Sequence, residues 1–255
     1  MARIAVAATA PFGADVLERL AAKHDVAQLL TRPDAPRGRG RRLAPSPAKD
    51  VAERLGIPVV HERDALDAET VVVCAYGLLI PESLLSRALW LNVHPSLLPR
   101  WRGAAPVERA IMAGDSQTGV TIHRTTKELD AGPIAAQEAF DVGPEDDAGV
   151  VYARAAEGAA RLLDGVLEHP AFTPQPDEGV TYAEKIVATD RELDPSRPAQ
   201  ELVDRVRALS PHIGARMGDL IVWKARADGD EFVPLEVQPP GGRRMEYEAY
   251  LRGRR

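Results

Sequence analysis

The sequence has 255 residues, of which 45% are hydrophobic and 27% are charged, which is typical of globular proteins and excludes a disordered or fibrous chain. At about 150 residues per domain, this length predicts one large domain, alone or with a small second one. The formal net charge of −6 argues against a protein that coats nucleic acid through its overall charge, although a local basic patch can still attract an anionic ligand.

Short apolar runs alternate with amphipathic segments along the first part of the chain. Strands are expected over residues 4–8, 25–30, 71–75 and 90–94, with helices over 14–23 and 47–55. Ser46 before Pro47 is a typical helix start. The alternation predicts crossover connections and therefore a Rossmann-like α/β fold, with a mostly parallel sheet flanked by helices.

The pattern changes after residue 91. Extended segments over 119–124 and 134–142 are expected to add antiparallel strands to the sheet, with helices over 107–113 and 147–166. Residues 190–198 have two prolines and few apolar residues, which predicts a linker between a domain over 1–189 and a smaller one over 199–255. The smaller domain is expected to hold a helix over 199–209, a hairpin of strands 220–226 and 231–238, and a helix over 245–251.

Asn92 and His94 are the first candidates for chemistry. They alternate on one predicted strand, so their side chains point to the same face, at the end where open α/β sheets bind ligands. An amide and an imidazole can together donate hydrogen bonds to a carbonyl oxygen that gains charge. The substrate would then supply the nucleophile, for example an amine, and Asp130 near the flexible Gly132 could hold the imidazole and move the amine proton. The structural alternative is that Asn92 and His94 only satisfy each other at a strand end.

These motifs carry a family resemblance. Residues 92–106, with Asp130 in a Leu-Asp-Ala-Gly context, resemble the folate-dependent formyltransferase superfamily, and the Trp-Arg-Gly-Ala-Ala-Pro stretch over 101–106 resembles its methionyl-tRNA formyltransferase branch. The resemblance extends over most of the chain and implies the formyltransferase fold. It also implies transfer of a formyl group from 10-formyltetrahydrofolate to the amino group of initiator methionyl-tRNA, without a metal.

The resemblance also implies roles for single residues. Asn92 and His94 would stabilise the oxyanion, while Asp130 would orient His94 and relay the proton. We expect the carboxylate of Asp130 to favour a protonated His94, because a nearby negative charge raises an imidazole pKa. The folate site would use backbone groups of three segments. They are Ser96, Leu97, Leu98 and Pro99 in one turn, Leu78, Leu79 and Ile80 in a second segment, and Glu128 in the loop before Asp130.

Residues 37–42 form a basic segment in an otherwise acidic domain, with Arg37, Arg39, Arg41 and Arg42 separated by glycines. Such a run is usually a solvated surface loop. Arginine is nonetheless well suited to bind phosphate, and together with the resemblance this predicts a tRNA-binding loop. The segment does not follow the first strand and lacks a third glycine, so it does not match a dinucleotide-binding fingerprint.

The tail is the main departure from the family. Members carry a five-stranded barrel of the oligonucleotide-binding type, whereas the residues after Arg197 are too few for one, so we expect a reduced β-rich module. Two alternatives therefore stay open. One is a folate-dependent formyltransferase for a small amine, such as an amino sugar or glycinamide ribonucleotide, which the short tail favours and the stretch over 101–106 opposes. The other is a non-catalytic RNA- or folate-binding protein.

The remaining titratable residues suggest no further site. The single cysteine, Cys74, excludes an intramolecular disulfide and is expected to be an inert core residue. The other histidines lack metal-ligand spacing and are expected to be structural or exposed: His24, His61, His123, His169 and His212. No apolar run reaches about 18 residues and no signal-peptide pattern is present, so we expect a cytoplasmic protein, and a monomer.

Overall fold

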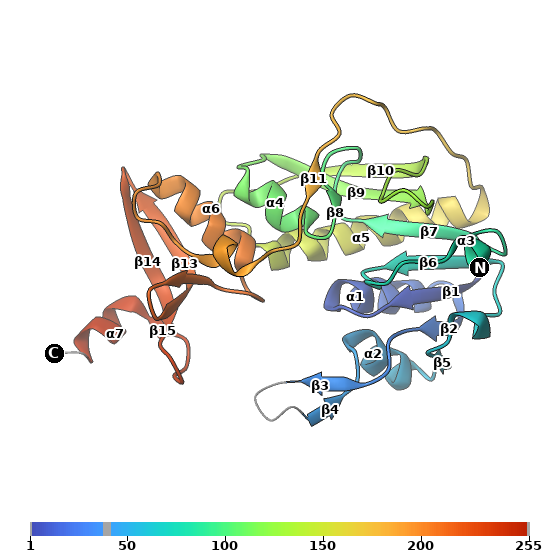
Figure 1. Cartoon of the computed structure of the whole chain (residues 1–255), viewed down its shortest axis with the longest axis horizontal. Coiled ribbons are helices and arrows are strands. Elements are labelled where there is room, and N and C mark those ends of the chain that lie inside the picture. Colours follow the sequence, from blue (N-terminus) through green and yellow to red (C-terminus); the bar gives the residue numbers. More distant parts are fainter. Residues whose placement is uncertain (1, 38–41, 254–255) are drawn as a thin grey trace. The chain divides into compact units, whose positions relative to one another are not determined.

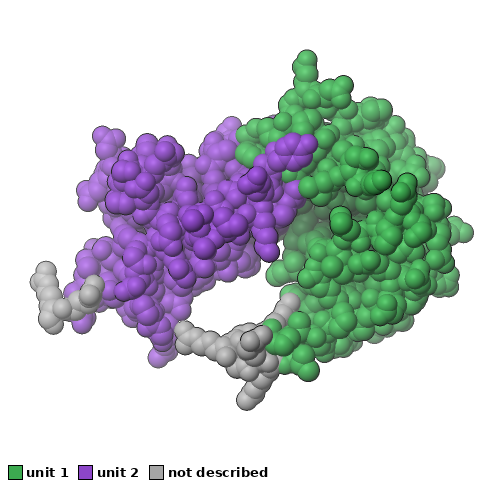
Figure 2. All heavy atoms as spheres, viewed as in Figure 1, with its two compact units in different colours: residues 1–102, 119–139, 153–181 green, residues 103–118, 140–152, 182–255 purple. Residues whose placement is uncertain are grey.

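The computed structural model describes residues 2–37 and 42–253 (Figure 1). The chain forms two compact units, coloured separately in Figure 2. The first unit comprises Met1–Arg102, Gly119–Ala139 and Ala153–Thr181. The second unit comprises Gly103–Thr118, Phe140–Tyr152 and Tyr182–Arg255.

The first unit is built on a seven-stranded sheet in the order β10-β9-β7-β6-β1-β2-β5. Its strands are β1 (Arg3–Ala8), β2 (Asp25–Leu30), β5 (Val59–Val60), β6 (Thr70–Cys74), β7 (Leu89–His94), β9 (Gln117–Arg124) and β10 (Ile134–Asp141). The neighbouring strands β5, β2, β1, β6 and β7 pair in parallel, and β9 pairs antiparallel to β7. The central strands β1 and β6 are apolar and buried along most of their length, as expected for strands covered on both faces. The predicted mostly parallel α/β sheet is confirmed.

Helices flank this sheet (Figure 1). They are α1 (Pro11–Ala21), α2 (Pro47–Leu55), the short α3 (Glu82–Leu85) and α5 (Ala148–Glu168, whose residues 148–152 belong to the second unit), with a 3-10 turn over Arg63–Ala65. The helix start predicted at Ser46 is confirmed, because the Ser46 hydroxyl accepts a hydrogen bond from the Lys49 backbone N–H at 3.1 Å. A core cluster including Val71, Val73 and Trp90 packs against Leu84 of α3. Cys74 is buried as predicted, and burial raises the pKa of its thiol well above the ordinary value.

A small hairpin follows β2 in the first unit. Its strands are β3 (Ala35–Arg37) and β4 (Arg42–Ala44), which pair antiparallel with Arg37 opposite Arg42. The tip of the predicted arginine loop, including Arg39 and Arg41, lies outside the described residues. The segment predicted to bind RNA therefore begins and ends on a β-ribbon.

The second unit combines helices with a four-stranded antiparallel sheet in the order β12-β13-β14-β15. Its elements are β8 (Arg102–Gly103, whose first residue belongs to the first unit), α4 (Pro106–Met112), β11 (Tyr182–Ala183), a 3-10 turn (Ala188–Arg191), α6 (Ala199–Leu209), β12 (Ala215–Met217), β13 (Leu220–Asp228), β14 (Glu231–Gln238), β15 (Met245–Glu246) and α7 (Tyr247–Arg252). One face of α6 packs Val206 and Leu209 against Val222 and Val237 of this sheet. Ala208 of the same helix belongs to a second cluster with α4. Helix α6 thus packs against both α4 and the sheet.

The tail differs in detail from the sequence expectation. The hairpin of β13 and β14 is confirmed, but two short strands, β12 and β15, extend it to four. Residues 245 and 246 belong to β15, so the final helix begins at Tyr247. The functional boundary at residues 190–198 stays a prediction. Within the described part of the chain, no helix combines the length and apolar composition needed to span a membrane.

Candidate active site

Strand β7 ends at the carboxyl edge of the parallel sheet, and it carries both catalytic candidates. In the antiparallel register of β7 and β9, Asn92 lies opposite His123, and His94 lies opposite Thr121. The side chains of Asn92 and His94 both reach the carboxylate of Asp130. The geometry therefore brings the three predicted catalytic residues together in the first unit.

Asp130 lies in the loop between β9 and β10 with a φ of 47°, in the left-handed region that few non-glycine residues adopt. Its Oδ1 accepts a hydrogen bond from the Asn92 amide at 3.1 Å, and its Oδ2 lies 3.6 Å from Nδ1 of His94. Nearby, a Cβ on Gly132 would lie 1.8 Å from the backbone oxygen of Arg124. Only glycine permits this close approach, which sets the path of the loop that presents Asp130.

His94 is buried, with a side-chain exposure of only 5%. Its Nε2 lies 2.8 Å from the backbone oxygen of Trp101. A carbonyl oxygen can only accept, so Nε2 carries a hydrogen and a neutral ring leaves the lone pair on Nδ1, facing Asp130. Burial lowers the pKa of His94, and this effect outweighs the opposing effect of the Asp130 carboxylate. Asp130 thus favours protonation of His94 as expected, but desolvation of the ring is the larger effect, so the neutral ring is favoured overall.

The site includes a histidine that sequence reasoning left out. Nε2 of His123 lies 3.0 Å from Nδ2 of Asn92, and Nδ1 of His123 lies 3.1 Å from the backbone oxygen of Arg124. The Arg124 oxygen accepts from Nδ1–H, so Nε2 is the acceptor for the Asn92 amide. The expected extended segment over 119–124 contained His123. Only the register between β7 and β9 places it opposite Asn92, and no spacing in the sequence gives that register.

The predicted folate turn uses its polar groups within the protein. The Thr121 hydroxyl donates to the Ser96 oxygen at 2.7 Å, and the Ser96 hydroxyl donates to the Arg100 oxygen at 2.7 Å. The Leu98 N–H donates to Thr121 Oγ1 at 3.1 Å, and the Leu98 oxygen accepts from Gln137 at 2.8 Å. Leu98 is also buried. This turn therefore offers shape and packing to a ligand more than free backbone groups.

The second predicted folate segment, Leu78, Leu79 and Ile80, differs from this turn in its exposure and its backbone hydrogen bonding. Leu78 and Leu79 are exposed, Leu79 by 84%. Within residues 2–37 and 42–253, the backbone of 78–80 has no hydrogen-bond partner. Glu128 is exposed too, although its backbone oxygen accepts from Thr126 Oγ1 at 3.2 Å. Exposed apolar side chains and unused backbone groups are features of a ligand-binding segment.

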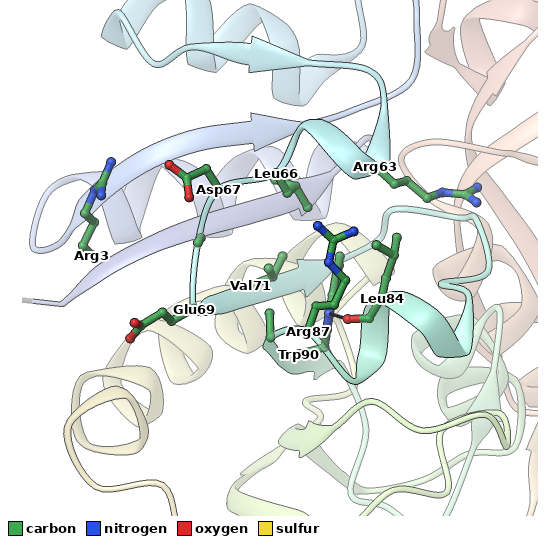
Figure 3. Close-up of a pocket in the computed structure, with 11 residues that line it drawn as sticks. Arg3, Arg63, Leu66, Asp67, Glu69, Val71, Leu84, Arg87 and Trp90 are labelled. Atoms are coloured by element: carbon green, nitrogen blue, oxygen red, sulfur yellow. Dashed lines mark hydrogen bonds between the residues drawn. The ribbon is translucent and has the colours of Figure 1, made fainter.

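A cavity of about 450 Å³ opens elsewhere in the first unit (Figure 3). Arg3, Val71 and Trp90 line it from the amino ends of β1, β6 and β7. The catalytic candidates lie at the carboxyl end of β7. This cavity is therefore separate from the site described above, and none of the predicted site residues that the structure describes lines it.

Known proteins resemble this chain over most of its length. A family model described as formyl transferase matches residues 2–167. The methionyl-tRNA formyltransferase of Roseobacter denitrificans is 44% identical over 230 residues, which cover 84% of this chain and 75% of that protein. The methionyl-tRNA formyltransferase of Xanthomonas axonopodis pv. citri is 42% identical over 262 residues, which cover 94% of this chain and 84% of that protein.

Solved structures share the fold. The methionyl-tRNA formyltransferase from Clostridium thermocellum superposes with a TM-score of 0.66 at 15% identity, over 96% of this chain and 99% of that one. An N-formyltransferase from Helicobacter canadensis, solved with folinic acid and dTDP-3-aminofucose, gives a TM-score of 0.69 at 15% identity, over 93% of this chain and 94% of that one. The chain therefore has the formyltransferase fold, and it belongs to the formyl transferase family and, within it, to the methionyl-tRNA formyltransferases.

Proposed function

We propose that this enzyme transfers the formyl group of 10-formyltetrahydrofolate to the α-amino group of initiator methionyl-tRNA. The observation that carries the proposal is the convergence of Asn92, His94 and Asp130 at the carboxyl end of β7, in a chain 44% identical to a methionyl-tRNA formyltransferase. Convergent polar groups at this edge of an α/β sheet are well placed for chemistry on a ligand.

The reaction begins with attack of the substrate amine on the formyl carbon, which forms a C–N bond and places negative charge on the formyl oxygen. Asn92 donates to this oxygen as the charge develops. Asp130 accepts the proton that the amine loses, and His94, whose Nδ1 lies 3.6 Å from Asp130, holds and returns it. This role replaces the oxyanion contact expected for His94, because its Nε2–H already donates to the Trp101 oxygen. When the C–N10 bond of the folate breaks, N10 takes the proton and tetrahydrofolate leaves.

Folate recognition is proposed at the exposed segment of Leu78, Leu79 and Ile80, together with the exposed Glu128. The backbone N–H and C=O groups at 78–80, which have no hydrogen-bond partner in the described part of the chain, suit the hydrogen-bonding edge of a pterin ring. The turn from Ser96 to Pro99 would limit the shape of the pocket. The N-formyltransferase from Helicobacter canadensis, which has a related fold, was solved with folinic acid, and this supports a folate as co-substrate.

Recognition of tRNA is proposed for the arginine segment, Arg37, Arg39, Arg41 and Arg42, and for the reduced C-terminal module over 199–255. Arg37 and Arg42 lie on the hairpin of β3 and β4, and arginine binds phosphate through paired donors. The relatives named methionyl-tRNA formyltransferase support a tRNA acceptor. The cytoplasmic location, the monomeric state and the absence of a metal stay predictions.

The test is an acceptor panel with 10-formyltetrahydrofolate as donor. We expect formyl transfer to charged initiator methionyl-tRNA, and none to deacylated tRNA or free methionine. Transfer to an amino sugar or glycinamide ribonucleotide, with the charged tRNA inert, would move the assignment to a small-amine formyltransferase. Tight folate binding without turnover on any acceptor would favour a binding protein.

A further inference from the structure

Gln175, in the loop that follows α5, contacts the backbone of the loop that carries Asp130. Its Nε2 donates to the Asp130 oxygen at 2.7 Å and to the Gly132 oxygen at 2.8 Å. The two bonds hold the backbone on both sides of Ala131. One side chain from a distant segment thus fixes the turn that presents the carboxylate.

Arg102 fixes the orientation of the Gln175 amide. The guanidinium donates to Oε1 of Gln175 from Nε at 3.0 Å and from an Nη at 2.6 Å. Because a guanidinium only donates, the amide oxygen of Gln175 faces Arg102 and the NH2 group faces the two carbonyls. Glutamine suits this position because it accepts on one side and donates twice on the other.

The position of the loop that carries Asp130 sets the distances from its carboxylate to Asn92 and His94. Asp130 has a φ of 47°, which surrounding contacts must maintain. Its carboxylate meets Asn92 at 3.1 Å and His94 at 3.6 Å, so a small shift of the backbone changes both distances. A displacement of about 1 Å at a catalytic group can cost about 10²-fold in rate.

We propose that Gln175 and Arg102 are positioning residues that hold Asp130 in its productive geometry through the Asp130 and Gly132 carbonyls. The proposal rests on the proposed formyl transfer for its kinetic consequence. Its structural part stands on the four hydrogen bonds alone.

The test variant is Gln175→Glu. It keeps an oxygen toward Arg102 but replaces the donor NH2 with a second oxygen that faces two carbonyls. We expect kcat to fall about 10–10²-fold, with KM for tRNA little changed and the melting temperature close to that of the wild type. The matched control is Gln28→Glu. Gln28 also accepts through Oε1, from the Asp67 N–H at 2.9 Å, and donates through Nε2, to the Ala65 oxygen at 3.3 Å, away from the site.

A double-mutant cycle separates positioning from general support. If Gln175 acts through Asp130, Gln175→Glu lowers residual single-turnover activity by less than about threefold in an Asp130→Ala background. The same loss in both backgrounds, or an unchanged kcat in the wild-type background, would overturn the proposal. Arg102→Lys, which keeps the charge but loses the paired donors, should show the same dependence on Asp130.

A second measurement is independent of the reaction. Asn92 is the only asparagine in the sequence, so asparagine labelled with ¹⁵N in its side chain gives one NH2 signal, from the amide that donates to Asp130. We expect this signal to move in Gln175→Glu and to stay in place in Gln28→Glu. An unmoved signal in Gln175→Glu would contradict the proposed positioning. A moved signal in a protein that does not formylate methionyl-tRNA would retain the positioning and reject only the proposed function.

Discussion

Asn92 donates its side-chain amide to the carboxylate of Asp130 at 3.1 Å, although 38 positions separate the two residues in the sequence. The same nitrogen also lies 3.0 Å from Nε2 of His123. A primary amide has only two N–H groups, so both are engaged before substrate arrives. Because the bond to the charged Asp130 is the stronger of the two, we expect the formyl oxygen to displace His123 as the acceptor.

The buried position of His94 predicts the direction of its titration. Burial lowers the pKa of His94 below its ordinary value of 6.5, and Asp130 opposes this shift. Neutral His94 is thus favoured in the folded state, and its contribution to stability is present above the ordinary pKa and lost as pH falls through the lowered one. A ¹³C–¹H NMR titration should give a His94 pKa below 6.5, and a lower value still in Asp130→Ala. An unchanged or higher pKa in Asp130→Ala would contradict the balance of burial and charge described here.

Gly132 should be intolerant of a methyl group. The Cβ of Gly132→Ala would meet the Arg124 oxygen at 1.8 Å, so the loop that carries Asp130 must move. We expect kcat to fall at least about tenfold, together with a shifted Asn92 NH2 signal. Gly165→Ala on α5 is the control, since its added Cβ would meet no described atom within 4 Å apart from its chain neighbours and the nearby backbone of its own helix, and it should keep full activity and melt slightly higher. Wild-type kcat in Gly132→Ala would show that the path of this loop does not control catalysis.

The sequence predicted much of the framework because its signals are local. Residues 25–30, 47–55, 199–209 and 231–238 form elements with the predicted bounds. The alternation of Asn92 and His94 predicted that their side chains point to the same face, and both reach Asp130. Strand pairing and burial are not local. The sequence could not show that His123 lies opposite Asn92, or that desolvation outweighs Asp130 at His94. Nor could it show that Thr121 and Gln137 use the backbone of the Ser96–Pro99 turn.

Glu108 in the second unit should make stability depend on pH. Burial raises the pKa of Glu108. Hydrogen bonds from the Tyr152 hydroxyl to the two carboxylate oxygens of Glu108, at 3.0 and 3.2 Å, act in the opposite direction. Stability from a raised carboxyl pKa is present below the ordinary value and is lost as pH rises through the raised one. Glu108→Gln should therefore melt above the wild type at pH 8, by about 2–4 °C for each kcal/mol gained, with a smaller difference at pH 5. The exposed Glu231→Gln is the control. A variant that is less stable than the wild type at pH 8 would show that ionised Glu108 is stabilising.

The arginine segment should act on tRNA binding rather than on chemistry. Replacing its four arginines with glutamine should raise KM for methionyl-tRNA and leave kcat at saturation unchanged. The slope of log KM against log salt should flatten by about 0.7–0.9 for each phosphate that the segment no longer neutralises. Arg63→Gln with Arg87→Gln, at the separate cavity, is the control for background effects of lost charge. An unchanged KM at physiological salt would exclude the segment from the interface.

Asp130 is the residue on which the proposed catalysis depends, because the side chains of Asn92 and His94 both face it. The most direct measurement is single-turnover formyl transfer to initiator methionyl-tRNA by the wild type and by Asp130→Ala, with the exposed Asp177→Ala as control. We predict that Asp130→Ala slows the step at least about 10²-fold at saturating substrates while its melting temperature is retained. Transfer by Asp130→Ala at the wild-type rate would contradict the assignment of this cluster as the active site.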